Sequence, residues 1–198
     1  MQTTRRLALI AVAAILAGCA TPAAQLSRAS VPDYRDTIDL TGRLSVNYER
    51  DGQPESLTGN FTWSQRPGRI DVSLASPLGQ TIAAISVTPE QATLTQAQRA
   101  PRVATDIDTL SAEALGWSLP VSGLRDWLQG YAFDADGKRF VASPANNSVF
   151  TRDGWRLRFV SWQDEHAARP VPRRIDAERS AGADAGELAI RIVIDPAA

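Results

Sequence analysis

Apolar and polar side chains alternate along much of the chain downstream of residue 40. Three runs place Gly, Leu, Val, Ile or an aromatic residue at every second position: residues 42–48, 57–63 and 70–74. The turns Asp51-Gly52 and Pro67-Gly68 separate these runs. A period of two with short turns predicts an antiparallel meander that has one apolar face. Residues 80–87 and 92–96 continue the meander, with a break at Pro89.

The spacing of apolar residues becomes helical in the middle of the chain. In residues 106–117 and 122–130, apolar side chains recur every three or four positions. Asp106 or Asp108 can cap the first segment, and Ser122 can cap the second. The sequence therefore predicts two short amphipathic helices between two groups of strands.

Strand patterns return in the last third of the chain. After the turn Asp153-Gly154, apolar residues from Trp155 onward alternate with arginines, and residues 173–180 and 188–194 are predicted to pair. The fold class is therefore mainly β, with helices inserted between antiparallel strands. Two short helices cover only part of a large curved sheet, which leaves room for a concave apolar cavity under a partial roof. A packed sandwich core without a cavity fits the same pattern.

The N-terminus has the features of a bacterial secretion signal. Arg5 and Arg6 precede an uncharged apolar run over residues 7–17, which is too short to span a bilayer. The ending Leu16-Ala17-Gly18-Cys19 resembles the lipobox of bacterial lipoproteins, in which the cysteine is lipidated and becomes the first residue. Three acyl chains on Cys19 would anchor the protein stably. The family rule for the next residue, Ala20, indicates the outer membrane.

The predicted domain organisation follows from this signal. Residues 1–18 form the signal peptide, residues 19–31 the lipidated cysteine and a flexible tether, and residues 32–198 a single domain. The chain is 43% hydrophobic, which suffices for a sizeable core. Without the signal peptide, 19 basic side chains face 22 acidic ones, and no basic stripe indicates nucleic-acid binding.

Candidate catalytic residues are scarce. Cys19 is the single cysteine, so its lipidation would exclude disulfides, thiolate metal sites and cysteine nucleophiles. The single histidine, His166, lies in the polar stretch 163–166, which indicates a solvated loop. No Gly-x-Ser-x-Gly motif and no Gly-rich phosphate loop occurs. We therefore predict a protein that is not an enzyme and needs neither cofactor nor metal.

Several motifs together resemble the LolB family of outer-membrane lipoproteins. The resemblance covers residues 40–194, and its carriers are Gly42-Arg43-Leu44, Phe61-Thr62-Trp63-Ser64-Gln65, Ser76-Pro77-Leu78-Gly79-Gln80-Thr81, Leu115-Gly116-Trp117, residues 120–130 and Asp153-Gly154-Trp155. The resemblance implies an incomplete antiparallel β-barrel whose short helices cover an apolar cavity. It also implies a monomer that accepts acylated lipoproteins from a LolA-like periplasmic carrier and inserts them into the inner leaflet of the outer membrane.

The resemblance assigns two kinds of site. The loop Pro77, Leu78 and Gly79 is expected to project an apolar residue that enters the membrane, whereas the pattern alone favours a plain turn with Leu78 folded back onto the sheet. The acyl-chain cavity is expected to be lined by Leu44, Val46, Phe61, Trp63, Ile70, Val72, Leu74, Ile82, Trp117, Trp127, Leu128, Trp155, Leu157 and Phe159.

Two other functions remain compatible with parts of the sequence. A structural or assembly lipoprotein would bind protein partners through a sheet edge, with a packed interior and a dispensable Leu78. A lipid-anchored hydrolase would have to use His166. The short segment 34–39 before the first strand also leaves open how completely the helices cover the cavity.

Overall fold

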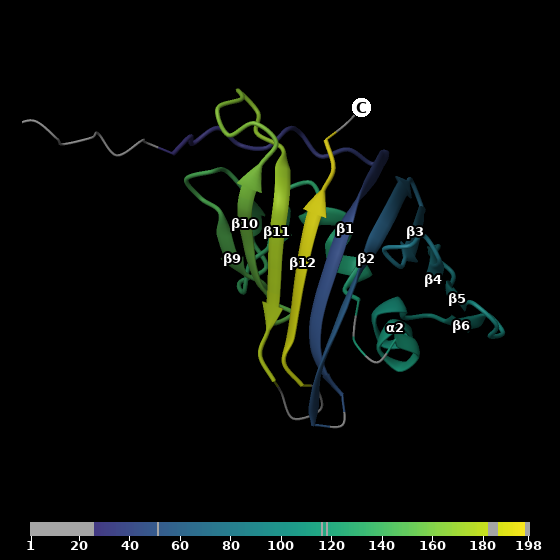
Figure 1. The fold of residues 1–198 in the computed structure, drawn as a ribbon. Coiled ribbons are helices and arrows are strands. Elements are labelled where there is room, and N and C mark those ends of the chain that lie inside the picture. Colours follow the sequence, from purple (N-terminus) through teal and green to yellow (C-terminus); the bar gives the residue numbers. More distant parts are fainter. Residues whose placement is uncertain (1–25, 51, 116, 118, 182–185, 197–198) are drawn as a thin grey trace, which may run out of the picture.

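The computed structural model describes residues 26–50, 52–115, 117, 119–181 and 186–196 (Figure 1). The predicted signal peptide and Cys19 lie outside these residues. Within them, ten strands form one antiparallel sheet: β1 (Ile38–Arg50), β2 (Gln53–Arg66), β3 (Arg69–Ala75), β4 (Thr81–Val87), β5 (Ala92–Gln96), β6 (Arg102–Ala104), β9 (Ser148–Phe150), β10 (Arg156–Trp162), β11 (Pro172–Arg179) and β12 (Leu188–Ile194).

The order of the strands leaves the barrel open. It runs β6-β5-β4-β3-β2-β1-β12-β11-β10-β9, and the short strands β6 and β9 form the two edges among the described residues. Two meanders are thus joined through β1 and β12, the first and last strands of the sheet, which pair antiparallel. The predicted fold class, an incomplete antiparallel β-barrel with short helices, is confirmed.

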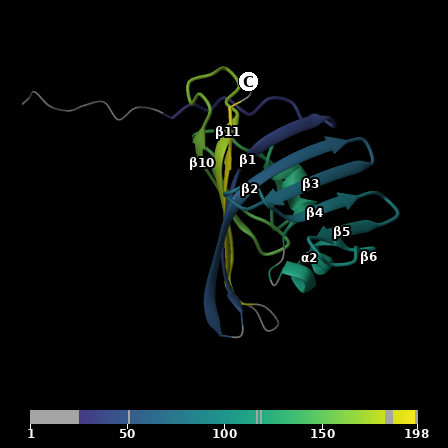
Figure 2. The same cartoon turned by 45° about the vertical axis from the view of Figure 1, so that its right-hand side comes forward.

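Close approach of neighbouring strands accompanies the strong curvature of the sheet. A Cβ atom on Gly42 would lie 2.2 Å from the carbonyl oxygen of Val193, and one on Gly59 would lie 2.3 Å from that of Ala75. Only glycine fits such positions without displacement of the backbone. Figure 2 shows β2 bending so that β3, β4 and β5 turn away from β10 and β11.

The two helices lie where the spacing predicts them. They are α2 (Ile107–Leu115) and α3 (Val121–Trp127), and a hairpin of β7 (Tyr131–Phe133) and β8 (Arg139–Val141) follows them. Asp106 caps α2, because its carboxylate accepts hydrogen bonds from the backbone N–H groups of Asp108 and Thr109.

The predicted cap of the second helix is wrong. Helix α3 begins at Val121, and its N-cap residue, Pro120, makes no side-chain capping bond. The carboxylate of Asp108 on α2 accepts a hydrogen bond from the backbone N–H of Ser122 at 3.3 Å. The hydroxyl of Ser122 instead donates a short hydrogen bond to the carboxylate of Asp108, which ties α3 to α2. The helix also ends earlier than predicted, at Trp127.

The last part of the predicted tether, residues 27–31, contacts the folded domain. The carbonyl oxygen of Ser27 accepts a hydrogen bond from the backbone N–H of Ala145, and the N–H of Val31 donates one to Ala142. The side chain of Val31 is also buried. The burial of Val31 and these paired backbone groups hold residues 27–31 against the domain.

Candidate functional site

A wholly apolar cavity lies between the inner face of the sheet and the helical segment. Its volume is about 20 Å³, and it is lined by Leu44, Phe61, Trp63, Val72, Leu74, Leu119, Leu124, Leu128 and Ile192. Strands β1, β2, β3 and β12 supply the floor, and residues 119–128 supply the roof. A volume of this size holds about one water molecule. In this conformation, side chains fill nearly all the space under the helices.

The predicted cavity residues divide into two groups in the structure. Those that line the cavity are Leu44, Phe61, Trp63, Val72, Leu74 and Leu128. The others lie in the surrounding core and are buried, apart from the half-buried Ile82: Val46, Ile70, Trp117, Trp127, Trp155, Leu157 and Phe159. The core and the cavity wall are therefore one continuous apolar layer.

Three cavity residues were not predicted. Leu124 has helical spacing to Leu128, and this spacing could have indicated it. Ile192 pairs with Leu44 in the sheet, but this register involves strands at opposite ends of the chain. Leu119 lies between the two helices, and no sequence pattern marks it.

The indole N–H of the buried Trp63 has a hydrogen-bond partner, which is itself bonded further. The indole Nε1 of Trp63 donates to Oε1 of Gln65 at 3.3 Å, and Nε2 of Gln65 donates to the hydroxyl of Tyr34 at 2.9 Å. Gln65 is 1% exposed, so these bonds prevent the cost of a buried unpaired amide. This short chain of bonds fixes the Trp63 ring against the cavity.

A second, larger hollow of about 450 Å³ lies beside α3 and is polar. Trp127 and Trp155 meet there edge to face with ring centroids 5.6 Å apart, and the guanidinium of Arg179 covers the Trp155 ring at 4.8 Å. Burial raises the pKa of both Asp108 and Asp126, which line this hollow. Burial therefore opposes ionisation of these two carboxyl groups more than it would at an exposed position.

The loop between β3 and β4 presents an apolar side chain to solvent. Leu78 is 91% exposed, so it does not fold back onto the sheet. Two backbone hydrogen bonds close the loop, from the N–H of Ser76 to the oxygen of Gln80 and from the N–H of Gly79 to the oxygen of Ser76. Gly79 has a φ of +84°, which glycine adopts without strain. The exposure of Leu78 is therefore a property of a defined turn.

Nothing in the described part of the chain assembles a catalytic group around the histidine. His166 is exposed in a turn, where its backbone N–H donates to the carboxylate of Asp164. Among the residues described, His, Cys, Asp and Glu side chains form no cluster that could hold a metal ion. No helix in the described ranges is long and apolar enough to cross a membrane.

Comparisons with known proteins identify the family of the chain. The family model described as outer membrane lipoprotein LolB matches residues 36–196. A protein named outer-membrane lipoprotein LolB from Cupriavidus necator is 42% identical over 200 residues, and one of the same name from Cupriavidus taiwanensis is 41% identical over 203 residues. Both alignments cover 99% of this chain and 98% of the relative.

A solved structure is also similar in outline. The crystal structure of a LolA superfamily protein from Nitrosomonas europaea aligns with a TM-score of 0.44 and 7% sequence identity, covering 85% of this chain and 87% of that one. The family assignment depends on the sequence matches alone, which span the chain at about 40% identity. The chain belongs to the LolB family of outer-membrane lipoproteins.

Proposed function

We propose that this protein accepts acylated lipoproteins from a LolA-like periplasmic carrier and inserts them into the outer membrane. The observation that carries the proposal is the pairing of an entirely apolar cavity with an exposed leucine on a defined loop. The cavity would hold the acyl chains of the cargo, and Leu78 would contact the bilayer. Cys19 would carry the lipid anchor.

The energetics of lipid transfer explain why a cavity is needed. Each buried CH₂ group contributes about 0.8 kcal/mol, so an acyl chain of about sixteen carbons resists entry into water by roughly 12 kcal/mol. An apolar cavity replaces the bilayer while the cargo is outside it. Transfer would then run from the carrier to this cavity and on to the membrane, in order of increasing affinity for the acyl chains.

The cavity must widen before an acyl chain can enter, because it now holds about one water molecule. The roof residues Leu119, Leu124 and Leu128 would move away from the sheet. The two hydrogen bonds that tie the helical segment to the strands come from α2, which precedes the roof: Arg50 donates to the carbonyl oxygen of Leu115 at 2.9 Å, and Gln96 donates to that of Ala114 at 3.4 Å. A displaced roof would expose the floor of the cavity to the cargo.

A two-step transfer assay tests the proposal. Mature protein without the lipid on Cys19 is first incubated with an acylated lipoprotein bound to its carrier, and liposomes are then added. We expect the wild type to take up the cargo and to release it to liposomes. The Leu78→Glu variant should take up the cargo but retain it, because a charged tip cannot enter the bilayer.

A matched control separates the loop from general surface effects. Val103 on the edge strand β6 is 57% exposed, so Val103→Glu adds the same charge elsewhere. It should transfer cargo like the wild type. If folded wild-type protein accepts no cargo, the acceptor function is wrong and the alternative, an assembly lipoprotein that binds protein partners, is favoured.

A further inference from the structure

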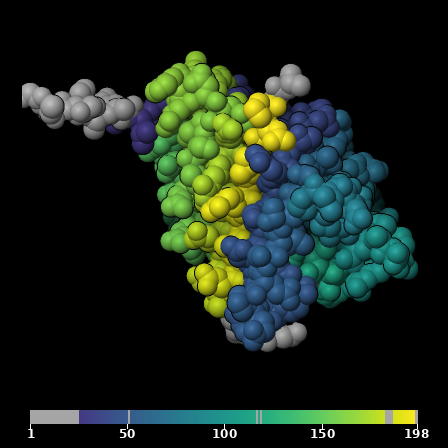
Figure 3. All heavy atoms as spheres, viewed as in Figure 1, coloured from purple at the N-terminus to yellow at the C-terminus, as the bar shows by residue number. Residues whose placement is uncertain are grey.

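The outer face of the sheet carries a concentrated group of arginines that the proposed transfer function does not use. The group lies on four adjacent strands and is named here the arginine face: Arg43 of β1, Arg156 and Arg158 of β10, Arg174 of β11 and Arg191 of β12. Figure 3 shows β1, β12 and β11 as one continuous surface on this side of the molecule.

Strand register aligns these arginines in rows across the sheet. Arg43 and Arg174 both pair with Val193, and Arg191 and Arg158 both pair with Asp176. The neighbouring positions on the same strands, such as Leu44 and Ile192, point inward and are buried. Since successive side chains alternate between the faces of a strand, all five arginines lie on the outer face.

Two carboxylates neutralise only part of this charge. Asp176 lies at the centre, with nitrogen–oxygen distances of 2.7 Å to Arg174, 3.5 Å to Arg191 and 3.7 Å to Arg158. Burial alone would raise the pKa of Asp176, but the three arginines outweigh it and hold the pKa below its usual range. Glu178 pairs with Arg156. Five guanidinium groups therefore face two carboxylates.

Carboxylates lie at both ends of these rows along the strands: Glu49 near the end of β1, and Asp195 directly after β12, where its backbone N–H donates to the carbonyl oxygen of Thr41. The mature chain as a whole has more acidic than basic side chains, so this positive surplus is a local feature. A positive area of this kind attracts anionic partners.

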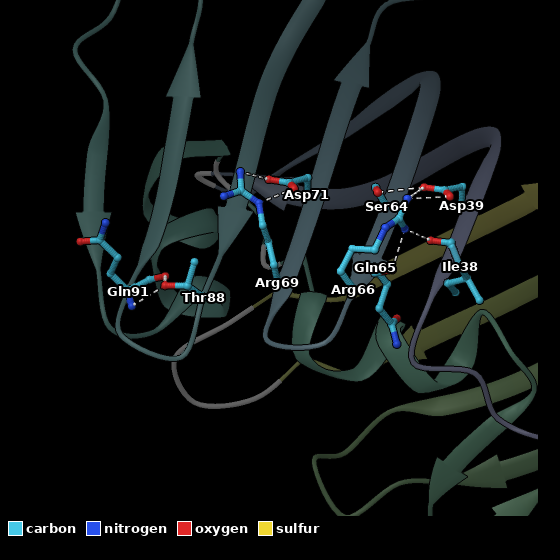
Figure 4. A network of polar contacts seen from close by, with 9 residues as sticks. All are labelled: Ile38, Asp39, Ser64, Gln65, Arg66, Arg69, Asp71, Thr88 and Gln91. Carbon is cyan, nitrogen blue, oxygen red and sulfur yellow. Dashed lines mark hydrogen bonds and ion pairs between the residues drawn. The ribbon is translucent and has the colours of Figure 1, made fainter.

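The other half of the outer face is different. On β2 to β5 the outward side chains are mainly serine and threonine, such as Thr62, Ser73 and Thr95. Near the turns, arginines pair one to one with carboxylates, Arg66 with Asp39 at 2.8 Å and Arg69 with Asp71 at 2.6 Å (Figure 4). Because each of these arginines pairs with one carboxylate, the pairs add no net positive charge to this half.

Register also places the arginine face next to the exposed loop. Arg43 pairs with Asn60, and Asn60 pairs with Ala75, the last residue of β3 before the loop that carries Leu78. Adjacent strands lie about 4.8 Å apart, so Ala75 is roughly 10 Å from Arg43 across the sheet. On the other side, the row of Arg158 ends at Ser148 on the edge strand β9, and Arg156 pairs with Phe150 of the same strand, which is 58% exposed.

We propose that the arginine face binds the phosphate groups of anionic phospholipids, so that it lies along the membrane surface while Leu78 enters the bilayer. Guanidinium groups form paired hydrogen bonds to phosphate oxygens. A membrane suits the surface better than an acidic protein, because exposed leucine and phenylalanine side chains lie at opposite ends of the charged area. The inference rests on the proposed function for the role of Leu78, whereas the arginines are a separate observation.

Vesicle binding tests this inference. Mature protein without the Cys19 lipid is sedimented with vesicles of phosphatidylcholine, either pure or containing phosphatidylglycerol, at constant ionic strength. We expect the wild type to prefer the anionic vesicles. The double variant Arg43→Gln/Arg156→Gln should bind them about 30-fold more weakly, because each arginine near an anionic surface contributes about 1 kcal/mol. Its binding to pure phosphatidylcholine should be unchanged.

The control variant loses the same net charge from another part of the molecule. Arg99 and Arg102 are exposed at and near the edge strand β6, outside the arginine face. The double variant Arg99→Gln/Arg102→Gln should keep the preference for anionic vesicles. An equal loss in both double variants would overturn the proposal in favour of a net-charge effect. Binding of inorganic phosphate by the wild type, together with no preference for anionic vesicles, would assign the arginine face to free phosphate instead.

The two proposals can fail separately. If cargo uptake and release are normal but all variants bind both kinds of vesicle equally, the arginine face has no membrane role and the acceptor function stands. If the wild type prefers anionic vesicles but accepts no cargo, the membrane-binding role of the arginine face is supported and the acceptor function is wrong. Capture of a soluble acidic protein without vesicle binding would assign the face to a protein partner.

Discussion

The two faces of strand β2 show how one stretch of chain serves two different purposes. Phe61 and Trp63 point inward and are buried, whereas the alternate residue Thr62 points outward and is exposed. The inner face consists of large apolar side chains that share one core and one cavity wall. The outer face contributes little buried area, and its charge varies from one half of the sheet to the other. We therefore expect inner positions to determine stability and outer positions to determine binding.

The strongest test of this division replaces Trp63 with alanine. Trp63 is 2% exposed and lines the cavity, so its loss removes a large buried side chain and enlarges the void. We expect Trp63→Ala to lower the free energy of unfolding by about 3 to 5 kcal/mol, measured by chemical denaturation. Thr62→Ala on the opposite face should change it by less than about 0.5 kcal/mol. Equal losses at both positions would contradict the division.

Gly42, where strands β1 and β12 approach closely, is a second inner position at which substitution should lower stability. In Gly42→Ala the new methyl group would meet the carbonyl oxygen of Val193 at 2.2 Å and the ring of Phe61 at 2.7 Å. Displacement of the backbone should cost about 1 to 3 kcal/mol, seen as a lower denaturation midpoint. Gly137→Ala is the contrast, since nothing lies within 4 Å of its added methyl group and only the positive φ is strained. A smaller loss at Gly42 than at Gly137 would disprove the close approach.

The sequence predicted the inner face well, because the signals for it are local. Alternation along residues 42–48 and 57–63 identifies strands β1 and β2 and the side that is buried. Helical spacing likewise identifies α2 and α3. The hairpin of β7 and β8 was missed because its strands have three residues each, too few for a period to be recognised.

The outer face could not be predicted because its features depend on register between distant strands. Arg43 and Arg174 are 131 positions apart in the sequence and become neighbours only because both pair with Val193. The volume of the cavity could not be predicted from the sequence either, because it depends on how Leu119 and Leu124 pack against the sheet. The exposure of Leu78 was expected from the family resemblance, whereas its turn alone favoured the opposite orientation.

The arginine face contains one outer position that should affect stability. Asp176 is buried at the centre of three arginines, so Asp176→Asn removes charge-assisted hydrogen bonds and leaves the cations to repel one another. We expect a loss of about 1.5 to 3 kcal/mol at pH 7. Because the pKa of Asp176 is lowered in the folded state, its contribution is present above the unfolded pKa, near 4, and is lost as pH falls through the folded pKa. Denaturation across pH 2 to 7 measures both effects.

The neutral half of the outer face supplies the control for this prediction. Asp71 also pairs with an arginine, at 2.6 Å, but both side chains are largely exposed. Asp71→Asn should therefore change the free energy of unfolding by at most about 1 kcal/mol. If Asp71→Asn lowered the free energy of unfolding as much as Asp176→Asn, the central position of Asp176 among three arginines would not contribute to stability.

The smallest expected effect concerns where a positive charge lies on the outer face. Thr95 is exposed on β5, four strands from β1, so an arginine placed there would lie roughly 19 Å across the sheet from Arg43. At physiological salt the screening length is about 8 Å, and the sheet also curves away from the arginine face between these strands.

The double variant Arg43→Gln/Thr95→Arg, which has the wild-type net charge, should therefore bind anionic vesicles as weakly as Arg43→Gln alone, about five-fold below the wild type. Both variants should unfold within about 0.5 kcal/mol of the wild type, because outer positions without a buried partner contribute little to stability. Recovery of binding by the arginine at position 95 would show that the total charge of the protein, and not the arrangement of its arginines, draws it to the membrane.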